Sequence, residues 1–357
     1  MPAAPLGPPR MDQPFIIGAV DSAMGKIPRV ASVLKWEDRV GTIKARWGIN
    51  RMDYKVDPGL YALGNPNPRS PVLVTANYKM SFDCLRQALG NLAAWILVLD
   101  TQGINVWCAA GKGTFGTEEL VRRVQASGLE KIVEHRELIV PQLGAPGIAA
   151  HAVKKISKFR VIYGPIQAKD IPAFLAAGMK ATPEMRRKTF GLRERTVLIP
   201  IELVAALKPL AAVLPALFIL GGLTGSGSFW ADACNHGLFA VLAIILGVGM
   251  GAVANPLLLP YIPGRAFALK GLILGVAGTL LLLVLATGFE GIHWGEKISL
   301  GFILSALATF LAMNFTGAST YTSLSGVKKE MRWAVPFEIA GGGVGIILWI
   351  SALVFKF

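Results

Sequence analysis

The sequence is poor in the residues that bind metals and transfer protons, with three cysteines and four histidines among 357 residues. Cys84, Cys108 and Cys234 have no Cys-x-x-Cys spacing, so they cannot by themselves form a zinc site or an iron–sulfur cluster. In a reducing compartment we expect Cys84 and Cys108 to be free thiols. Cys84 lies within a predicted helix, where a buried small apolar role is expected.

Charge is nearly absent from the second half of the chain. Residues 1–204 hold 45 of the 58 charged side chains, whereas 205–357 hold 13. A membrane-spanning helix needs roughly 17–25 apolar residues. The second half contains five uncharged stretches of about this length or longer, and they predict transmembrane helices near 200–223, 238–260, 266–288, 298–318 and 334–355.

Basic residues alternate between the loops that join these helices. Five of them, from Arg186 to Arg195, precede the first helix, and others follow the second and fourth. By the positive-inside rule this pattern predicts a multi-pass protein of the cytoplasmic membrane with its amino-terminal domain in the cytoplasm. The proline-rich opening lacks the apolar core of a signal peptide. The net charge of +14 is concentrated beside the first helix, which favours membrane lipid rather than nucleic acid as a partner.

The chain is expected to have four parts. These are a disordered amino terminus (1–14), a cytoplasmic α/β domain (15–180), a basic juxtamembrane linker (181–197) and a five-helix transmembrane domain (198–357). From residue 71 strands alternate with helices, which predicts a parallel, Rossmann-like sheet. Strands are expected at 71–76, 95–100, within 131–141 and at 159–165, and helices near 81–92, 117–127, 147–157 and 168–178, with Thr117 as a helix cap.

Ligands of parallel α/β sheets bind beyond the carboxyl ends of the strands. The segments expected there are 77–79, 101–114, 141–147 and 163–165, which are rich in glycine, proline and short polar residues. Candidate ligand contacts at this edge are Thr75, Asn77, Gln142, Gly144 and Gly164.

One of these segments contains the stretch "INVWCAAGKGT" (104–114). It is not a phosphate-binding loop, because GxxxxGK[ST] would require glycine at Val106 and serine or threonine at Gly113. A nucleophilic cysteine would need a histidine base, and His135 and His151 are the candidates in the α/β domain. The sequence leaves this alternative open.

The same stretch also fits a metal ligand. If Asn105 caps a short helix, Cys108 lies in its first turn, where the helix end and Lys112 would favour the thiolate. A single thiolate suits a cofactor that supplies its other metal ligands, as a tetrapyrrole does. Ala109, Ala110 and Gly111 would leave room for a flat macrocycle. Trp107 fits a cofactor contact and a core position equally well.

The motif "NVWCAAGK" (105–112) closely resembles the cap-helix motif of the mercury-methylating corrinoid proteins of the HgcA family. This resemblance extends over the whole chain. It implies a corrinoid-binding domain similar to that of the corrinoid iron–sulfur protein, followed by five membrane helices. It also implies that Cys108 is the catalytic residue and the lower axial ligand of cobalt. The residues that it implies around the corrinoid are Asn105, Val106, Trp107, Ala109, Ala110, Gly111 and Lys112. The Asp-x-His-x-x-Gly motif of other cobalamin proteins is absent, in agreement with a cysteine ligand.

By the same resemblance, the protein is a corrinoid-dependent methyltransferase that passes a methyl group to Hg(II) and forms methylmercury. The implied partners are a methylated folate or pterin methyltransferase as methyl source and a small ferredoxin-type iron–sulfur protein as electron donor. Two alternatives remain: a membrane corrinoid methyl carrier of one-carbon metabolism with another acceptor, and a transporter with a regulatory cytoplasmic domain.

Overall fold

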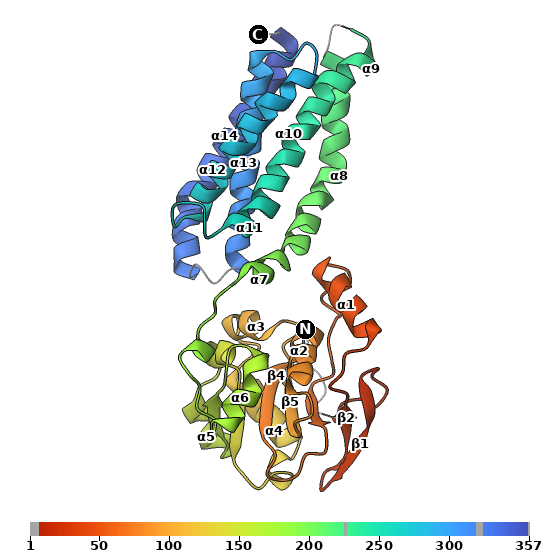
Figure 1. Cartoon of the computed structure of the whole chain (residues 1–357), viewed down its shortest axis with the longest axis vertical. Coiled ribbons are helices and arrows are strands. Elements are labelled where there is room, and N and C mark those ends of the chain that lie inside the picture. The colour runs from red at the N-terminus through yellow and green to blue at the C-terminus, as the bar shows by residue number, and fades with distance from the viewer. Residues whose placement is uncertain (1–6, 225–226, 319–323, 356–357) are drawn as a thin grey trace. The chain divides into compact units, whose positions relative to one another are not determined.

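The computed structural model describes residues 7–224, 227–318 and 324–355. The chain divides into two units (Figure 1). The sheet unit comprises the residues up to Ala45 together with Ile49–Lys188, and the helical unit comprises Arg46–Gly48 together with the residues from Thr189 onward.

Within the described residues the sheet unit has one sheet of seven strands, in the spatial order β1-β2-β3-β5-β4-β6-β7. The strands are β1 (Ile16–Ser22), β2 (Gly25–Val30), β3 (Gly59–Leu63), β4 (Val72–Ala76), β5 (Ala94–Leu99), β6 (Glu137–Val140) and β7 (Arg160–Tyr163). The last four are the strands expected from the sequence.

The sheet is mixed rather than wholly parallel. Strands β5, β4, β6 and β7 pair in parallel, as expected, but β3 pairs antiparallel with β5, and β1 forms an antiparallel hairpin with β2. Residues 15–70 carry no clear strand–helix alternation, which is why the sequence did not reveal these three strands. The expectation of a Rossmann-like parallel sheet therefore holds for the half of the sheet that carries the connecting helices.

Helices cover both faces of the sheet, so β4 and β5 are buried along their whole length. One face packs against α3 (Val106–Lys112), α4 (Thr117–Ala126) and α5 (Ala150–Ser157). The other packs against α2 (Lys79–Leu89) and α6 (Ile171–Ala176). Short 3₁₀ segments complete this unit: η1 (Leu129–Lys131), η2 (Gln142–Gly147), η3 (Ala168–Asp170) and η4 (Glu184–Arg186). α1 (Trp36–Arg46) links β2 to β3.

Part of the segment expected to be disordered is packed. Residues 1–6 lie outside the described residues, but Gln13 is buried and donates a hydrogen bond to the Tyr61 hydroxyl at 3.0 Å. Arg10 forms an ion pair with Asp57 at 2.8 Å. Proline content suggested disorder, whereas these long-range polar contacts fix the segment against β3.

The helical unit contains, among its described residues, five helices that are long and apolar enough to cross a membrane, as expected. Its elements are α7 (Leu192–Thr196), α8 (Ile199–Thr224), α9 (Phe229–Asp232), η5 (Ala233–Gly237), α10 (Leu238–Val248), η6 (Gly249–Ala254), α11 (Asn255–Leu258), α12 (Phe267–Leu285), η7 (Ala286–Gly288), α13 (Trp294–Asn314), η8 (Phe315–Ala318) and α14 (Leu324–Phe355). The second crossing runs continuously from Phe229 to Leu258.

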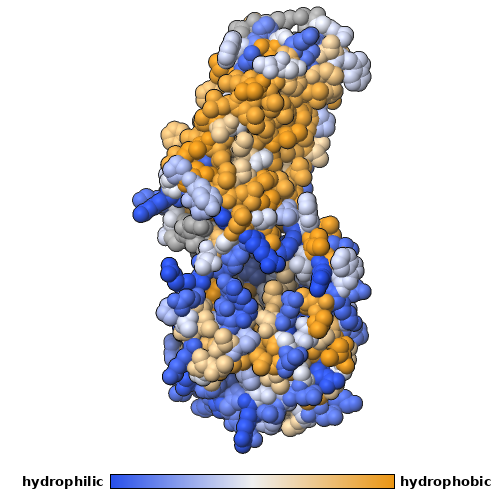
Figure 2. Space-filling model, viewed as in Figure 1, coloured by the Kyte–Doolittle hydropathy of each residue, from blue (hydrophilic) through white to orange (hydrophobic). Residues whose placement is uncertain are grey.

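Small and paired polar residues hold these helices together. A Cβ on Gly275 of α12 would lie 2.7 Å from the Cα of Ser305 on α13, so the two backbones approach closely. The second and fourth crossings begin earlier than expected because they include a polar pair, in which His236 Nδ1 lies 2.9 Å from the fully buried carboxylate of Glu296. Figure 2 shows the apolar side chains that form most of the visible surface of this unit.

Candidate functional site

The candidate site lies at the carboxyl edge of the parallel strands, where β4 ends before Asn77 and β5 ends before Asp100. The two strands are paired in parallel up to Ala76 and Leu99, so both chain exits meet at the same edge. The exit of β5 continues through residues 100–105 into α3, which carries Cys108. The position of Cys108 therefore depends on how firmly this exit loop is held.

Asn77 holds the loop from one side. Its Oδ1 accepts hydrogen bonds from the Thr101 amide at 3.1 Å, the Thr101 hydroxyl at 2.8 Å and the Gly103 amide at 3.0 Å. Its Nδ2 donates to Asp100 Oδ1 at 3.1 Å. Asn77 is only 2% exposed, so these bonds form in a dry environment. Asn77 was predicted to contact a ligand, and in the structure its side chain fixes the loop.

The loop is held from a second side by α4. Glu119 Oε1 accepts the Asp100 amide at 2.8 Å and is itself held by Arg123 at 2.6 Å. Gly103 has φ = +74°, and a Cβ there would lie 2.7 Å from the Met52 carbonyl oxygen, so only glycine fits. The Thr101 hydroxyl also lies 2.7 Å from the Ile104 carbonyl oxygen, so it shares its single proton between this oxygen and Asn77 Oδ1 and closes the turn.

α3 begins where the sequence predicted. The Asn105 side chain accepts the Cys108 amide at 3.0 Å, which is the hydrogen bond of an N-cap, and Gly113 ends the helix in the left-handed conformation. Cys108 is therefore in the first turn, and its side chain is exposed. The expected local geometry around this residue is present.

Ala109 and Ala110 have a different role from the one expected. Both are buried in the core below α3 and face away from the exposed side of the helix. Their small size lets η2 approach, since a Cβ on Gly147 would lie 3.2 Å from the Ala110 Cα. The two alanines thus position α3 on the fold and do not provide clearance for a bound group.

The exposed side of α3 presents Trp107, Cys108, Gly111 and Lys112. Cys108 and Gly111 are three residues apart and so lie on the same face of the helix. A Cβ on Gly111 would meet no atom within 4 Å, so the space beside the thiol is open. Trp107 is 38% exposed, which makes it a surface residue rather than a core residue. Val106 is partly buried and packs against the core.

The donor set at this face is a single thiol. No group of three or more histidine, cysteine, aspartate or glutamate side chains able to hold a metal ion occurs in the parts of the chain that the structure describes. A metal bound by Cys108 must then receive its other ligands from elsewhere. A planar macrocycle with its own metal fits this face, because it needs one donor from below and an unobstructed surface beside it.

An open pocket of about 650 Å³ adjoins the other end of α3. It is lined by residues that follow β5, by Gly113 and Thr114 after α3, and by the first turn of α4. Thr117 was predicted to cap α4, but Gly116 occupies the cap position, and the Thr117 hydroxyl instead accepts the Ala149 amide at 2.8 Å. The pocket combines two threonines with Glu118, Glu119 and Arg122, so it is polar and suited to the polar part of a large ligand.

The histidine candidates do not form a catalytic pair with Cys108. His135 lies before β6 at the opposite edge of the sheet, where its Nε2 is 2.9 Å from the Ser70 carbonyl oxygen. His151 is an exposed residue of α5. Within the described residues, neither imidazole makes a hydrogen bond with Cys108, so the arrangement does not support a nucleophilic cysteine.

Three of the remaining predicted contacts, Thr75, Gly144 and Gly164, are packed inside the fold, and the fourth, Gln142, is partly exposed. Thr75 is buried within β4 beside Val98 of β5. Gly144 of η2 faces the ring of Phe115 with no room for a Cβ, and a Cβ on Gly164 would lie 3.0 Å from Ile139. Gln142 accepts a hydrogen bond from Arg186 at 2.8 Å. Of these, Gln142 and Gly144 are near α3, because η2 packs against it.

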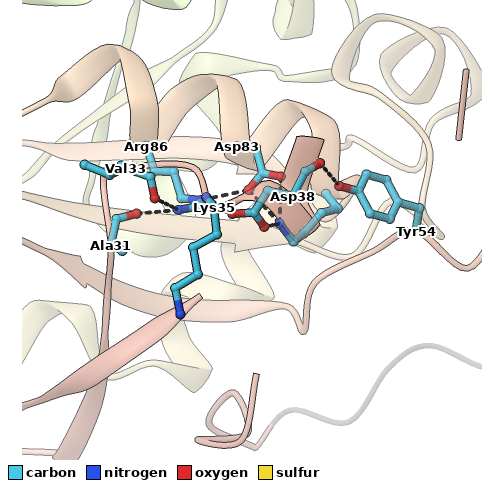
Figure 3. A network of polar contacts seen from close by, with 8 residues as sticks. Ala31, Val33, Lys35, Asp38, Tyr54, Asp83 and Arg86 are labelled. Atoms are coloured by element: carbon cyan, nitrogen blue, oxygen red, sulfur yellow. Dashed lines mark hydrogen bonds and ion pairs between the residues drawn. The ribbon is translucent and has the colours of Figure 1, made fainter. Parts of the chain in front are cut away.

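A buried ionic network on the other face of the sheet was not predicted (Figure 3). Lys79 and Arg86 of α2 each contact both Asp83 of α2 and Asp38 of α1, with distances of 2.6–2.7 Å. Arg86 is fully buried and also donates to the Ala31 carbonyl at 2.6 Å. Two cations and two anions balance, as a buried set must. The sequence signals are the i, i+4 spacing of Lys79 and Asp83 and the i, i+3 spacing of Asp83 and Arg86.

The network changes the proton affinity of its members and neighbours. Burial by itself raises the pKa of Asp38, but hydrogen bonds and charge from Lys79 and Arg86 outweigh it, so this pKa is below the usual value for aspartate. Burial raises the pKa of Tyr54 to about 12, and its protonated hydroxyl donates to the Asp38 carbonyl at 3.0 Å. At neutral pH the network therefore joins α1 to α2 and, through Ala31, to the segment before α1. The Tyr54 hydroxyl adds a contact from the segment after α1.

Residues 45–175, which contain most of this site, match the family model described as CO dehydrogenase/acetyl-CoA synthase delta subunit. The chain is 32% identical over 127 residues to the acetyl-CoA decarbonylase/synthase complex subunit gamma of Methanopyrus kandleri, covering 35% of this chain and 27% of the relative. The subunit of the same name from Archaeoglobus fulgidus is 30% identical over 139 residues, covering 38% and 29%.

A corrinoid/iron-sulfur protein large subunit from Moorella thermoacetica is 27% identical over 127 residues, covering 35% of this chain and 28% of the relative. The expected similarity to the corrinoid iron–sulfur protein is thus found. The chain spans between a quarter and a third of the length of each of these three relatives.

Proposed function

We propose that the sheet unit binds a corrinoid on the exposed face of α3, with the Cys108 thiolate as lower ligand of cobalt, and that the protein is a corrinoid-dependent methyltransferase. The observation that carries this proposal is the single exposed thiol on a capped helix whose exit loop is fixed by Asn77 and Glu119. The similarity of residues 45–175 to subunits that include a corrinoid/iron-sulfur protein supports the same cofactor.

The residues around Cys108 hold the thiolate in place and leave its outer side accessible. Asn105 fixes the first turn of α3, and the buried Ala109 and Ala110 keep the helix against η2. Gly111 leaves the space beside the sulfur open. Lys112, one turn after Cys108, adds positive charge to the exposed face of α3.

A bound corrinoid supplies a cobalt that carries a methyl group and can release it with its bonding electrons to a soft electrophile. We infer that Hg(II) is the acceptor and methylmercury the product, since the motif at 105–112 resembles that of the mercury-methylating corrinoid proteins. The methyl group leaves with its bonding electron pair, whereas the next methyl group would arrive from a folate or pterin as a methyl cation, so each turnover requires two electrons from outside the chain. A ferredoxin-type iron–sulfur partner would return these electrons, and a methylated folate or pterin methyltransferase would supply the next methyl group.

The membrane placement of this activity is also a proposal. Five helices of the chain are long and apolar enough to cross a membrane. The basic residues between 186 and 195 precede the first of them, which favours a cytoplasmic position for the sheet unit in the cytoplasmic membrane. There the corrinoid would have access to soluble methyl and electron donors.

A second candidate is a membrane-bound methyl carrier that serves another acceptor of one-carbon metabolism. The names of the relatives, which are subunits of acetyl-CoA decarbonylase/synthase complexes, favour this alternative. It uses the same Cys108 site and differs only in the acceptor. Methyl transfer to Hg(II) compared with transfer to a thiol by the same loaded protein separates the two.

The proposal is tested by the cobalt coordination of the full-length protein reconstituted with a cobamide. Wild type is expected to hold the cofactor with Co–S scattering in its X-ray absorption spectrum, and Cys108→Ala to lose that scattering and to change its visible spectrum. Cys84→Ala is the matched control and should keep both. Only nitrogen, oxygen and carbon neighbours of cobalt in the wild type would overturn the ligand assignment.

A further inference from the structure

The helix α1 has its polar and apolar sides reversed relative to an ordinary helix of a globular domain. Asp38 and Ala45 are its buried residues. Trp36 and Ile43 are exposed to 71% and 53%. The buried carboxylate is on the inner face, where Lys79 and Arg86 hold it (Figure 3), and large apolar side chains are on the outer face.

The outer apolar residues form one stripe. Trp36, Val40 and Ile43 are separated by four and three residues, which is the spacing of a single helix face. Apolar exposure also extends to both sides of the helix, at Val33 and Met52. Figure 2 shows apolar side chains at the surface over α1, next to hydrophilic ones.

Basic residues border this stripe. With about 100° of rotation per residue, Arg39 and Lys44 lie on opposite sides of the line through Trp36 and Ile43, and both are exposed. Lys35 precedes the helix and Arg51 follows it. Long basic side chains beside an apolar stripe with tryptophan are the pattern of helices that lie in a lipid headgroup layer.

We propose that α1 is an interfacial anchor that binds the anionic surface of the membrane crossed by the helical unit. The apolar stripe enters the boundary between headgroups and acyl chains, and Arg39 and Lys44 contact lipid phosphates. The ionic network and the buried Ala45 fix α1 through its inner face, so the stripe is held outward. The anchor ties the sheet unit to the membrane surface by a contact additional to the chain connection.

This binding is independent of any cofactor and is tested with the full-length protein in nanodiscs. The lipid is phosphatidylcholine with about one quarter phosphatidylglycerol, so that the surface is anionic. A photoreactive p-benzoylphenylalanine at Ile43 is expected to give a lipid adduct after illumination, detected by mass spectrometry. The same group at Leu280, which is 60% exposed on α12, is the positive control for membrane insertion. Lys26 at the exposed start of β2 is the negative control.

Charge and lipid composition give the sharper test. Arg39→Gln with Lys44→Gln should lower the lipid adduct at position 43 by about fivefold, as should nanodiscs of phosphatidylcholine alone. The adduct at Leu280 should be unchanged in both. A lipid adduct at 280 without one at 43 would overturn the proposal. So would a crosslink from position 43 to protein, whether to another copy or to the helical unit, or an adduct at 43 that ignores lipid charge.

Discussion

α2 and α3 each follow a parallel strand, and each carries one exposed cysteine, yet the two helices differ in everything around that thiol. α2 buries Lys79, Asp83 and Arg86 in an ionic network, and Cys84 is on its outer side. α3 buries only two alanines and places Cys108 in its first turn at the sheet edge. Exposure alone therefore does not identify the functional thiol. The proposed role of Cys108 rests on its place in a capped first turn after a fixed strand exit.

The sequence predicted Cys84 to be buried, and this was wrong. The buried positions of α2 on either side of Cys84 are Asp83 and Leu85, so the charged residue that would ordinarily face solvent is inside. When a helix buries charged residues, its polar face points toward the core and not toward solvent. The hydrophobicity of single residues does not reveal this orientation. The comparison between the two helices can be tested by substitutions in each.

The largest difference in activity is expected between variants in which one or the other cysteine is replaced by alanine. Cys108→Ala should lower methyl transfer to Hg(II) by at least roughly a hundredfold, because even a group that only hydrogen-bonds to a metal ligand contributes about 10–100-fold. Cys84→Ala should retain nearly full activity. The measurement is the rate of methyl transfer to Hg(II) by each purified, cobamide-loaded variant. A large loss of activity in Cys84→Ala would mean that the site has been assigned to the wrong helix.

A large structural effect is expected in α2. Asp83→Ala leaves Lys79 and Arg86 buried with one carboxylate between them, and removal of one partner from a buried ion set costs about 3–5 kcal/mol. Denaturant unfolding of the sheet unit in the full-length protein measures this loss. Cys84→Ser on the same helix, next to Asp83 but exposed, is the control. Equal stability of the two variants would mean that the network is not closed as described.

A smaller loss is expected at the exit loop of α3. Asn77→Ala leaves the amides of Thr101 and Gly103 without their acceptor, which should cost about 1–3 kcal/mol. Hydrogen exchange of residues 101–108 should increase, and cobamide should bind more weakly. Unchanged exchange in this segment would show that Glu119 alone holds the loop.

The cap of α3 should contribute less again. Asn105→Ala removes the acceptor of the Cys108 amide, a change that typically costs about 1 kcal/mol. Local exchange in α3 should rise while global stability changes little. Asn105→Asp keeps a capping oxygen and should behave like wild type, so an equal effect of both substitutions would argue against the cap.

The smallest expected effect is the loss of unfolding free energy at acid pH that comes from the ionic network of α2. Because the pKa of Asp38 is lowered in the folded state, its contribution to stability is complete above the unfolded value of about 3.9 and is lost as pH falls through the folded value. Burial offsets part of this shift. Unfolding free energies measured between neutral pH and pH 3 should fall less steeply for Asp38→Asn than for wild type. Identical slopes would contradict the lowered pKa.

Local periodicity and composition were sufficient for the features that depend on neighbouring residues. The five apolar helices, the strands β4 to β7 and the Asn105 cap all follow from segment length, hydrophobic runs and capping chemistry, which act over a few residues. The segment 105–112 likewise indicated a thiol in a first helical turn. These properties need no knowledge of the rest of the fold.

Only the tertiary structure decided which faces those elements present. It paired β3 antiparallel with β5, turned Ala109 and Ala110 into the core, made Asn77 a support for the exit loop and buried the charges of α2 while exposing the apolar stripe of α1. Each of these depends on a partner far away in the chain: Asp38 for Lys79, Glu119 for Asp100, η2 for α3. Sequence spacing sets the period of a helix, but the free energy of long-range contacts sets its rotation.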